Sequence, residues 1–150
     1  MHAPTIRLAN VADADAISEL FVQLGHPAGP EEVAARLERF AQAGEEALVA
    51  ELDGAVVGVT ALSVMPTLHR PTPVGRMSVL VVSEAVRGQG IGRALVAAAE
   101  ARLAERGCAL AEVTSNQQRV QAHAFYEGLG YERTSFRFFK ALGGRPYLDH

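Results

Sequence analysis

The sequence predicts one α/β domain with a mixed sheet, in which an antiparallel meander of strands precedes a single parallel pair. Asp53-Gly54 is a strong hairpin signal between two apolar stretches. Beyond residue 75 the order is strand, helix, strand, which implies parallel neighbours joined by a right-handed crossover. With 150 residues, 49% of them hydrophobic, the chain has the size of one domain, and we expect residues 1–150 to share one core.

The N-terminal part of the chain predicts one strand and two helices. The stretch "TIRLA" (5–9) is a short strand. Asn10 then caps a helix, in which apolar residues recur at helical spacing until Gly25. Pro30 begins a second helix that ends at Gly44.

Three strands follow. "ALVAEL" (47–52) and "AVVGVTALSV" (55–64) flank the hairpin turn. "GRMSVLVV" (75–82) is a nearly continuous apolar run, which is typical of a central strand covered on both faces.

The rest of the chain alternates helices and strands. A helix from Gly90 to Arg106 leads to the strand "CALAEVT" (108–114). A helix over 119–129 and a last strand, "RTSFRFFKA" (133–141), complete the order βααβββαβαβ. Flanking helices therefore accompany the mixed sheet.

The composition indicates which kinds of binding partner and which cellular compartment to expect. The net charge of −3, from 14 basic and 17 acidic residues that are mixed along the chain, shows no basic stripe, so we expect neither a nucleic-acid nor a membrane partner. No basic leader followed by an apolar run begins the chain, and no stretch reaches about 18 apolar residues, which favours a cytoplasmic protein. Cys108 is the single cysteine and is interpreted as structural, and the five scattered histidines predict no metal site.

A glycine-rich turn, Arg87-Gly88-Gln89-Gly90-Ile91-Gly92-Arg93, lies between the buried strand and a helix N-terminus. A helix start leaves up to four amides without helical partners, and glycines let a diphosphate approach them closely. Arg87 and Arg93 add positive charge. The alternative is a tight turn without a ligand. The spacing fits neither a Walker loop, which needs Lys-Ser or Lys-Thr, nor a Gly-x-Gly-x-x-Gly fingerprint.

Two motifs in this order resemble one family. "VRGQGIGRAL" after "SVLVV" resembles the acyl-CoA loop of the GNAT superfamily of N-acetyltransferases, whose pattern Arg/Gln-x-x-Gly-x-Gly/Ala is matched by Arg87, Gly90 and Gly92. "SNQQRVQAHAFYEGLGY" is similar to a second stretch of that family, and the element order matches from Ile6 to Lys140. The resemblance implies acetyl-CoA as acyl donor, a small-molecule or peptide amine as acceptor, and a possible homodimer.

The resemblance also implies roles for individual residues. The amides of the turn bind the pyrophosphate of coenzyme A, and the fourth strand separates from the fifth at Leu80 to Val82, so that pantetheine lies in the gap. Asn116 matches a cofactor contact, the alternative being a turn residue. The implied cofactor-binding residues are Leu80, Val81, Val82, Arg87, Gly88, Gln89, Gly90, Ile91, Gly92, Arg93 and Asn116.

Tyr126 is the implied catalytic acid, which protonates the leaving thiolate, and the alternative is a core tyrosine. A phenol with a pKa near 10 gives its proton to a thiolate near 8.5 at a cost of about 2 kcal/mol. The site must therefore raise the basicity of the thiolate or lower the pKa of Tyr126. A strand amide, that of Val81 or Val82, is the expected donor to the oxyanion.

The general base is left open. Many GNAT proteins carry a carboxylate on the fourth strand, where this chain has Ser78 and Val79. His69, His123, Glu112 and solvent remain as candidates.

The acceptor site is expected between two loops, Leu24–Pro30 and Met65–Pro73. Nearby acidic residues are interpreted as solvated helix surface; they are Glu31, Glu32, Glu45 and Glu46. The favoured function is acetyl transfer to a primary amine by direct attack. A non-catalytic acyl-CoA-binding or sensor domain is the alternative, and a plain nucleotide-binding module is a third interpretation.

Overall fold

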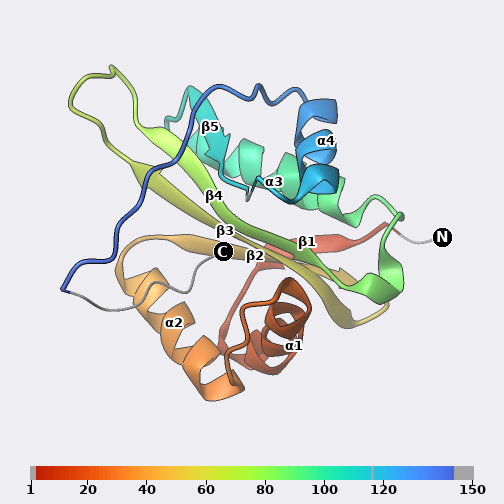
Figure 1. Cartoon of the computed structure of the whole chain (residues 1–150). Helices are drawn as coiled ribbons and strands as arrows, with labels where there is room; N and C mark the ends of the chain where they lie inside the picture. Colours follow the sequence, from red (N-terminus) through yellow and green to blue (C-terminus); the bar gives the residue numbers. More distant parts are fainter. Residues whose placement is uncertain (1–2, 116, 144–150) are drawn as a thin grey trace. The chain divides into compact units, whose positions relative to one another are not determined.

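The structure is a computed structural model that describes residues 3–115 and 117–143 (Figure 1). These residues fall into two compact units that divide after Val113. The first unit contains the sheet and three α-helices, and the second contains helix α4 (Val120–Gly128). Within the described residues, no helix has the length and apolar character to cross a membrane.

Five strands form one sheet in the order of the chain (Figure 1). The first three pairings are antiparallel and the fourth is parallel, which confirms the predicted meander followed by one parallel pair. The strands are β1 (Thr5–Leu8), β2 (Glu46–Leu52), β3 (Ala55–Met65), β4 (Val74–Val82) and β5 (Leu110–Val113).

The hairpin between β2 and β3 turns at the predicted dipeptide. Leu52 pairs with Ala55 across Asp53 and Gly54. Both turn residues have positive φ angles, 52° and 82°, as a two-residue hairpin turn with right-handed strand twist requires. Local turn chemistry therefore sets the register of this pair.

Helices α1 (Ala14–Leu24) and α2 (Pro30–Gln42) cover one face of the sheet, and α3 (Ile91–Glu105) covers the other (Figure 1). On the first face a cluster of buried side chains forms the core; it comprises Ala14, Ile17, Leu20, Val33, Val49, Val59 and Val81. Asn10 caps a short 3₁₀ turn that leads into α1, and its capping box with Asp13 is complete.

On the second face α3 lies very close to the sheet because two strand residues are glycines. A Cβ on Gly58 would stand 2.9 Å from Leu95 Cδ1, and one on Gly75 would stand 2.8 Å from Leu103 Cδ1. Leu95 and Leu103 are both buried. The absence of side chains at these two strand positions therefore sets the depth at which α3 packs.

A β-bulge interrupts β4. Ala61 pairs with Val79 but Leu62 pairs with Met77, so Ser78 is an extra residue without an opposite partner on β3. The pairing of β4 with β5 runs from Val74 to Met77 and ends at this bulge. The paired part of β4 and β5 therefore ends before Leu80 to Val82, the residues at which the separation of the two strands is expected.

The predicted last strand at 133–141 is wrong, because the described residues there adopt no strand. Phe136 and Phe138 in this stretch are 79% and 91% exposed. Alternating apolar residues form a strand only when a neighbouring backbone and a buried face are both present. β5 is also shorter than expected, since it begins at Leu110 and not at Cys108.

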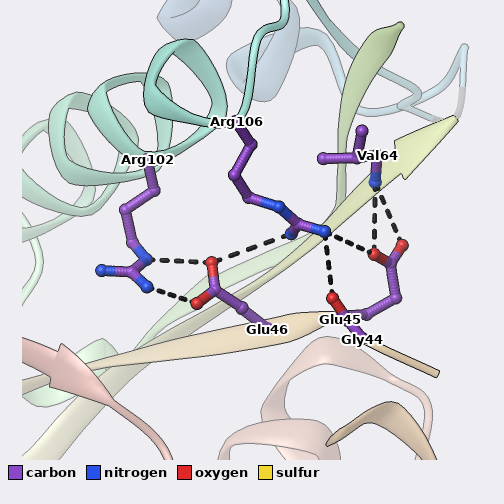
Figure 2. A network of polar contacts seen from close by, with 6 residues as sticks. All are labelled: Gly44, Glu45, Glu46, Val64, Arg102 and Arg106. Carbon is purple, nitrogen blue, oxygen red and sulfur yellow. Dashed lines mark hydrogen bonds and ion pairs between the residues drawn. The ribbon is translucent and has the colours of Figure 1, made fainter. Parts of the chain in front are cut away.

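A polar network ties the C-terminal half of α3 to the start of β2 and the end of β3 (Figure 2). Arg102 Nε donates to Glu46 Oε1 at 2.9 Å, and its Nη2 contacts Glu46 Oε2. Arg106 Nη2 donates to the Gly44 carbonyl at 3.0 Å and lies 3.3 Å from Glu45 Oε1. Glu45 Oε2 in turn accepts from the Val64 amide at 3.1 Å.

This network corrects the prediction for Glu45 and Glu46. Their side chains are only 17% and 19% exposed and lie between β2 and α3 rather than on a solvated helix surface. Glu31 and Glu32 are exposed, in the first turn of α2, as predicted. The position in the sequence distinguishes Glu45 and Glu46 from Glu31 and Glu32. Glu46 is the first residue of an apolar strand, whereas Glu31 and Glu32 lie in the first turn of a helix.

Glu46→Gln is expected to lower the free energy of unfolding by about 1–2 kcal/mol at pH 7, because charge-assisted hydrogen bonds are stronger than neutral ones. Arg102 lowers the pKa of Glu46 from its ordinary 4.5. The stabilisation is therefore full above that pH and disappears as the pH falls through the lower, folded-state value. Urea unfolding from pH 7 to pH 3 measures the difference between wild type and variant.

Glu32→Gln is the matched control, since Glu32 forms an exposed ion pair with Arg36 at 3.0 Å. We expect little change in stability from this variant. Equal losses from Glu46→Gln and Glu32→Gln, or a Glu46→Gln loss that persists at pH 3, would contradict the prediction.

Candidate functional site

The glycine-rich turn follows β4 and opens α3. A 3₁₀ turn (Glu84–Val86) comes first, and the residues from Arg87 to Gly90 are exposed. Gly88 and Gly90 have φ angles of +82° and +80°, a region that residues with a Cβ avoid. Gly88 and Gly90 therefore allow a backbone conformation that other residues avoid, and the space around them is open.

Backbone donors gather where α3 begins. The first helical hydrogen bond of α3 runs from the Ala94 amide to the Gly90 carbonyl at 3.0 Å. The amides of Ile91, Gly92 and Arg93 precede this bond and point out of the helix end. Successive amides around a positive-φ residue form a concave anion site.

The charges around this helix end favour an anion. The first turn of α3 contains no acidic residue, whereas α1 and α2 begin with Asp15 and with Glu31 and Glu32. The positive end of the α3 dipole is therefore not neutralised by its own side chains. Arg93 lies in the same turn and is exposed.

The second part of the site is the free edge of β4. The Ser83 amide donates to the Val57 carbonyl at 2.8 Å, so Ser83 and Val57 are a hydrogen-bonded pair. Because such pairs alternate along antiparallel strands, Val81 also bonds to β3, whereas the backbone groups of Leu80 and Val82 point to the opposite edge. Pairing with β5 ends at Met77, so among the described residues up to Val113 no strand pairs with this edge beyond that point, and we call it the open edge.

The open edge distinguishes the two residues considered for the oxyanion. The Val82 amide points to the open edge, and the Val82 carbonyl accepts a long hydrogen bond of 3.4 Å from Arg87 Nε. The Val81 amide points to β3, and the Val81 side chain, 5% exposed, belongs to the core below α1 and α2. Val81 therefore packs in the core with α1 and α2, and its amide is not available at the open edge.

Tyr126 lies on α4, in the second compact unit. Its ring packs edge-on against Phe125 and Tyr131, with centroids 5.3 Å and 5.9 Å away. Burial raises the pKa of Tyr126 above its ordinary value of 10, and the charge of Arg119 opposes this only in part. The phenol is therefore held in its protonated form, and a lowered Tyr126 pKa does not assist proton transfer.

The remaining candidates from the sequence are spread over the chain. Asn116 lies outside the described residues. Glu112 pairs with its cross-strand neighbour Arg76 at 2.7 Å, which occupies its carboxylate. His69 is exposed in the β3–β4 loop, and His123 is half-buried on α4. Among the described residues, no cluster of His, Cys, Asp or Glu side chains is arranged to hold a metal ion.

The two loops expected to form the acceptor site lie at opposite ends of β4. The β3–β4 loop adjoins Val74 at its start, where Val74 pairs with Met65. The α1–α2 loop lies near the end of β4, because Gln23 Oε1 accepts from the Glu84 amide at 2.9 Å. Nine strand residues, about 26 Å, separate these ends. Only the α1–α2 loop lies near the open edge, and Ser18 fixes it by donating to the Ala28 carbonyl at 2.6 Å.

An open strand edge that leads into an amide-rich helix start is the geometry expected from the acyl-CoA loop. The sequence matches the model of the Acetyltransferase (GNAT) family over residues 14–131. The chain belongs to this family. GNAT enzymes take their acetyl group from acetyl-CoA, so this chain is an N-acetyltransferase by family.

Relatives of the GNAT chain include two enzymes. Aminoalkylphosphonate N-acetyltransferase of Salmonella typhimurium is 41% identical over 90 residues, which are 60% of this chain and 58% of that enzyme. Aminoglycoside N(6')-acetyltransferase type 1 of Stenotrophomonas maltophilia is 34% identical over 136 residues and 88% of each chain. The solved structure of aminoglycoside N-acetyltransferase AAC(6')-Iy with CoA has a TM-score of 0.82 at 22% identity, over 94% of this chain and 95% of that one.

Gly90→Ala is expected to weaken coenzyme A binding by about tenfold, because a Cβ at φ +80° costs roughly 1–2 kcal/mol and the turn relaxes away from its anion-binding shape. A Cβ at Gly90 meets nothing within 4 Å, so crowding within the protein is not the cause. Isothermal titration with coenzyme A measures the affinity, and circular dichroism measures the stability.

Gly107→Ala is the matched control at the other end of α3. Gly107 has φ +90° and equally open surroundings, but it lies about 22 Å along the helix from the turn. Its substitution should lower stability by a similar amount and leave the coenzyme A affinity unchanged. Equal weakening of affinity by both variants would contradict the anion-binding role of the turn.

Proposed function

We propose that this GNAT protein transfers an acetyl group from acetyl-CoA to a primary amine of a small molecule, by direct attack within a ternary complex. The observation that carries the proposal is the continuity of the open β4 edge with the glycine-rich turn. The edge presents the backbone of Leu80 and Val82, and the turn presents the amides at the start of α3. In acetyl-CoA the thioester arm would lie along the open edge and the diphosphate, which follows it, would lie at the turn.

The chain's own residues fit the donor substrate. The residues from Arg87 to Arg93 hold the diphosphate through backbone amides, with Arg87 and Arg93 as supplementary charges. Leu80 and Val82 pair with the amides of the pantetheine arm, as an added strand would. Arg87 must then leave the Val82 carbonyl, a step that costs little because its hydrogen bond is 3.4 Å long.

The Val82 amide and Tyr126 are assigned to the acyl-transfer step. The amine nitrogen bonds to the thioester carbon while the carbon–sulfur bond breaks, and the nitrogen releases its surplus proton to solvent. The Val82 amide donates to the oxygen on which charge develops. The leaving thiolate takes the phenol proton of Tyr126, which solvent then restores. Because burial raises the pKa of Tyr126, this transfer requires a thiolate made more basic by its own desolvation.

Deprotonation of the amine is assigned to solvent. An amine with a pKa near 10.4 is neutral about once in 2,500 molecules at pH 7, which corresponds to about 4.6 kcal/mol. β4 offers Ser78 and Val79 where a carboxylate would stand, and Glu112 is engaged by Arg76. The fraction of neutral amine in water therefore limits the reaction near neutral pH.

The relatives support a small-molecule acceptor. The name of one indicates aminoalkylphosphonates and that of the other aminoglycosides, and both classes carry primary amines on small molecules. They differ in charge, since an aminoalkylphosphonate is anionic at one end and an aminoglycoside is polycationic. A panel containing both classes tests the acceptor by charge as well as by size.

The panel experiment measures thiol release from acetyl-CoA with anionic, neutral and polycationic amines. We expect turnover with at least one small amine, and saturable binding of coenzyme A in its absence. Failure of the protein to bind coenzyme A would refute the proposed function. Coenzyme A binding without thiol release from any amine would favour the acyl-CoA sensor instead.

Tyr126→Phe is expected to lower kcat by about 10²-fold with little change in the affinity for coenzyme A, because it removes a proton donor and keeps the ring contacts. The loss should be similar at every pH up to about 10, since the raised pKa keeps Tyr126 protonated over that range.

Tyr131→Phe is the control within the same aromatic cluster, and steady-state kinetics compares the two variants. An unchanged kcat for Tyr126→Phe, or equal losses for both variants, would contradict the assignment of Tyr126 as the acid.

A further inference from the structure

A side chain of α1 holds the backbone that leads into the turn. Gln23 lies in the last turn of α1 and is exposed, yet its Oε1 accepts from the Glu84 amide at 2.9 Å across 61 residues of sequence. Glu84 directly follows Ser83, whose amide bonds to β3 through the Val57 carbonyl at 2.8 Å. The chain that leaves β4 is thus held by a strand at one residue and by a helix at the next.

The turn that follows has few such restraints. Ser83 Oγ accepts from the Ala85 amide at 3.3 Å, and the Val86 amide bonds to the Ser83 carbonyl at 3.1 Å, so residues 83–86 form a small anchored unit. From Arg87 to Gly90 the chain is exposed, and Gly88 and Gly90 have open space around them. The direction of the anion-binding turn therefore depends on the anchored unit before it.

We propose that Gln23 is a positioning residue for the acyl donor: its hydrogen bond to the Glu84 amide orients the glycine-rich turn for the diphosphate of coenzyme A. This inference rests on the proposed function. Helix α1 also leads into the α1–α2 loop, one of the two loops expected to form the acceptor site. The hydrogen bond of Gln23 therefore links this loop to the turn proposed to bind the acyl donor.

Because the hydrogen bond between Gln23 and the Glu84 amide lies near the surface, we expect it to affect the affinity for coenzyme A more than the stability of the fold. The Glu84 amide is near the surface, so water replaces the lost acceptor and the fold loses little. The turn, however, gains freedom that binding must then remove, and this appears as weaker affinity. A single neutral hydrogen bond corresponds to a change of about two- to tenfold.

Gln23→Met tests the inference, because methionine keeps the length of the side chain and lacks a strong acceptor. We expect the KM for acetyl-CoA to rise about two- to tenfold, with kcat and the unfolding midpoint unchanged. The kcat/KM for acetyl-pantetheine, which has the thioester arm without the nucleotide diphosphate, should not change. A merely structural role of Gln23 would affect both donors alike.

Gln42→Met is the matched control, since Gln42 is also exposed and ends α2. It should leave every parameter at its wild-type value. An unchanged KM for acetyl-CoA in Gln23→Met, or equal losses with acetyl-CoA and acetyl-pantetheine, would overturn the role of Gln23. A wild-type protein that fails to bind coenzyme A would instead refute the proposed function itself, so the two failures are distinguishable.

Discussion

The functional geometry depends on the point at which β4 stops pairing with β5. Ser78 is an extra residue in β4, and the parallel pairing ends at Met77, directly before it. The strand keeps its pairing with β3 up to Val82, and among the described residues of the first unit no strand pairs with its other edge after Met77. The bulge thus leaves the end of a central strand available for the proposed binding of the acyl donor, while Val81 stays in the core.

Helix α3 connects this edge to the rest of the molecule. The glycine-rich turn joins its N-terminus to β4, Leu95 and Leu103 pack closely on Gly58 and Gly75, and Arg102 and Arg106 at its C-terminal end contact the carboxylates of Glu46 and Glu45. These contacts are spread over the whole helix. The direction of the helix dipole, on which the proposed anion binding depends, is therefore set by contacts along α3 as well as at its N-terminus.

Much of this arrangement could be predicted from the sequence because its signals are local. Asp53 and Gly54 have positive φ angles, and so do Gly88 and Gly90, so the hairpin and the position of the strand-to-helix turn are confirmed as backbone features. The last strand was mispredicted because alternating apolar residues are not sufficient for a strand: Phe136 and Phe138 alternate, but they are exposed and the described residues 133–141 form no strand. The bulge at Ser78 and the link from Gln23 to Glu84 depend on partners about 20 to 60 residues away, which local patterns do not encode.

The unpaired edge of β4 also bears on the solubility of the protein. Exposed donors and acceptors along an extended strand are a template for the backbone of any other chain, and natural proteins keep such stretches short or covered. Here the stretch ends within a few residues, where Glu84 and Arg87 place opposite charges beside it. An acyl carrier bound as proposed would cover the same atoms and would therefore also shield this edge from the backbone of other chains.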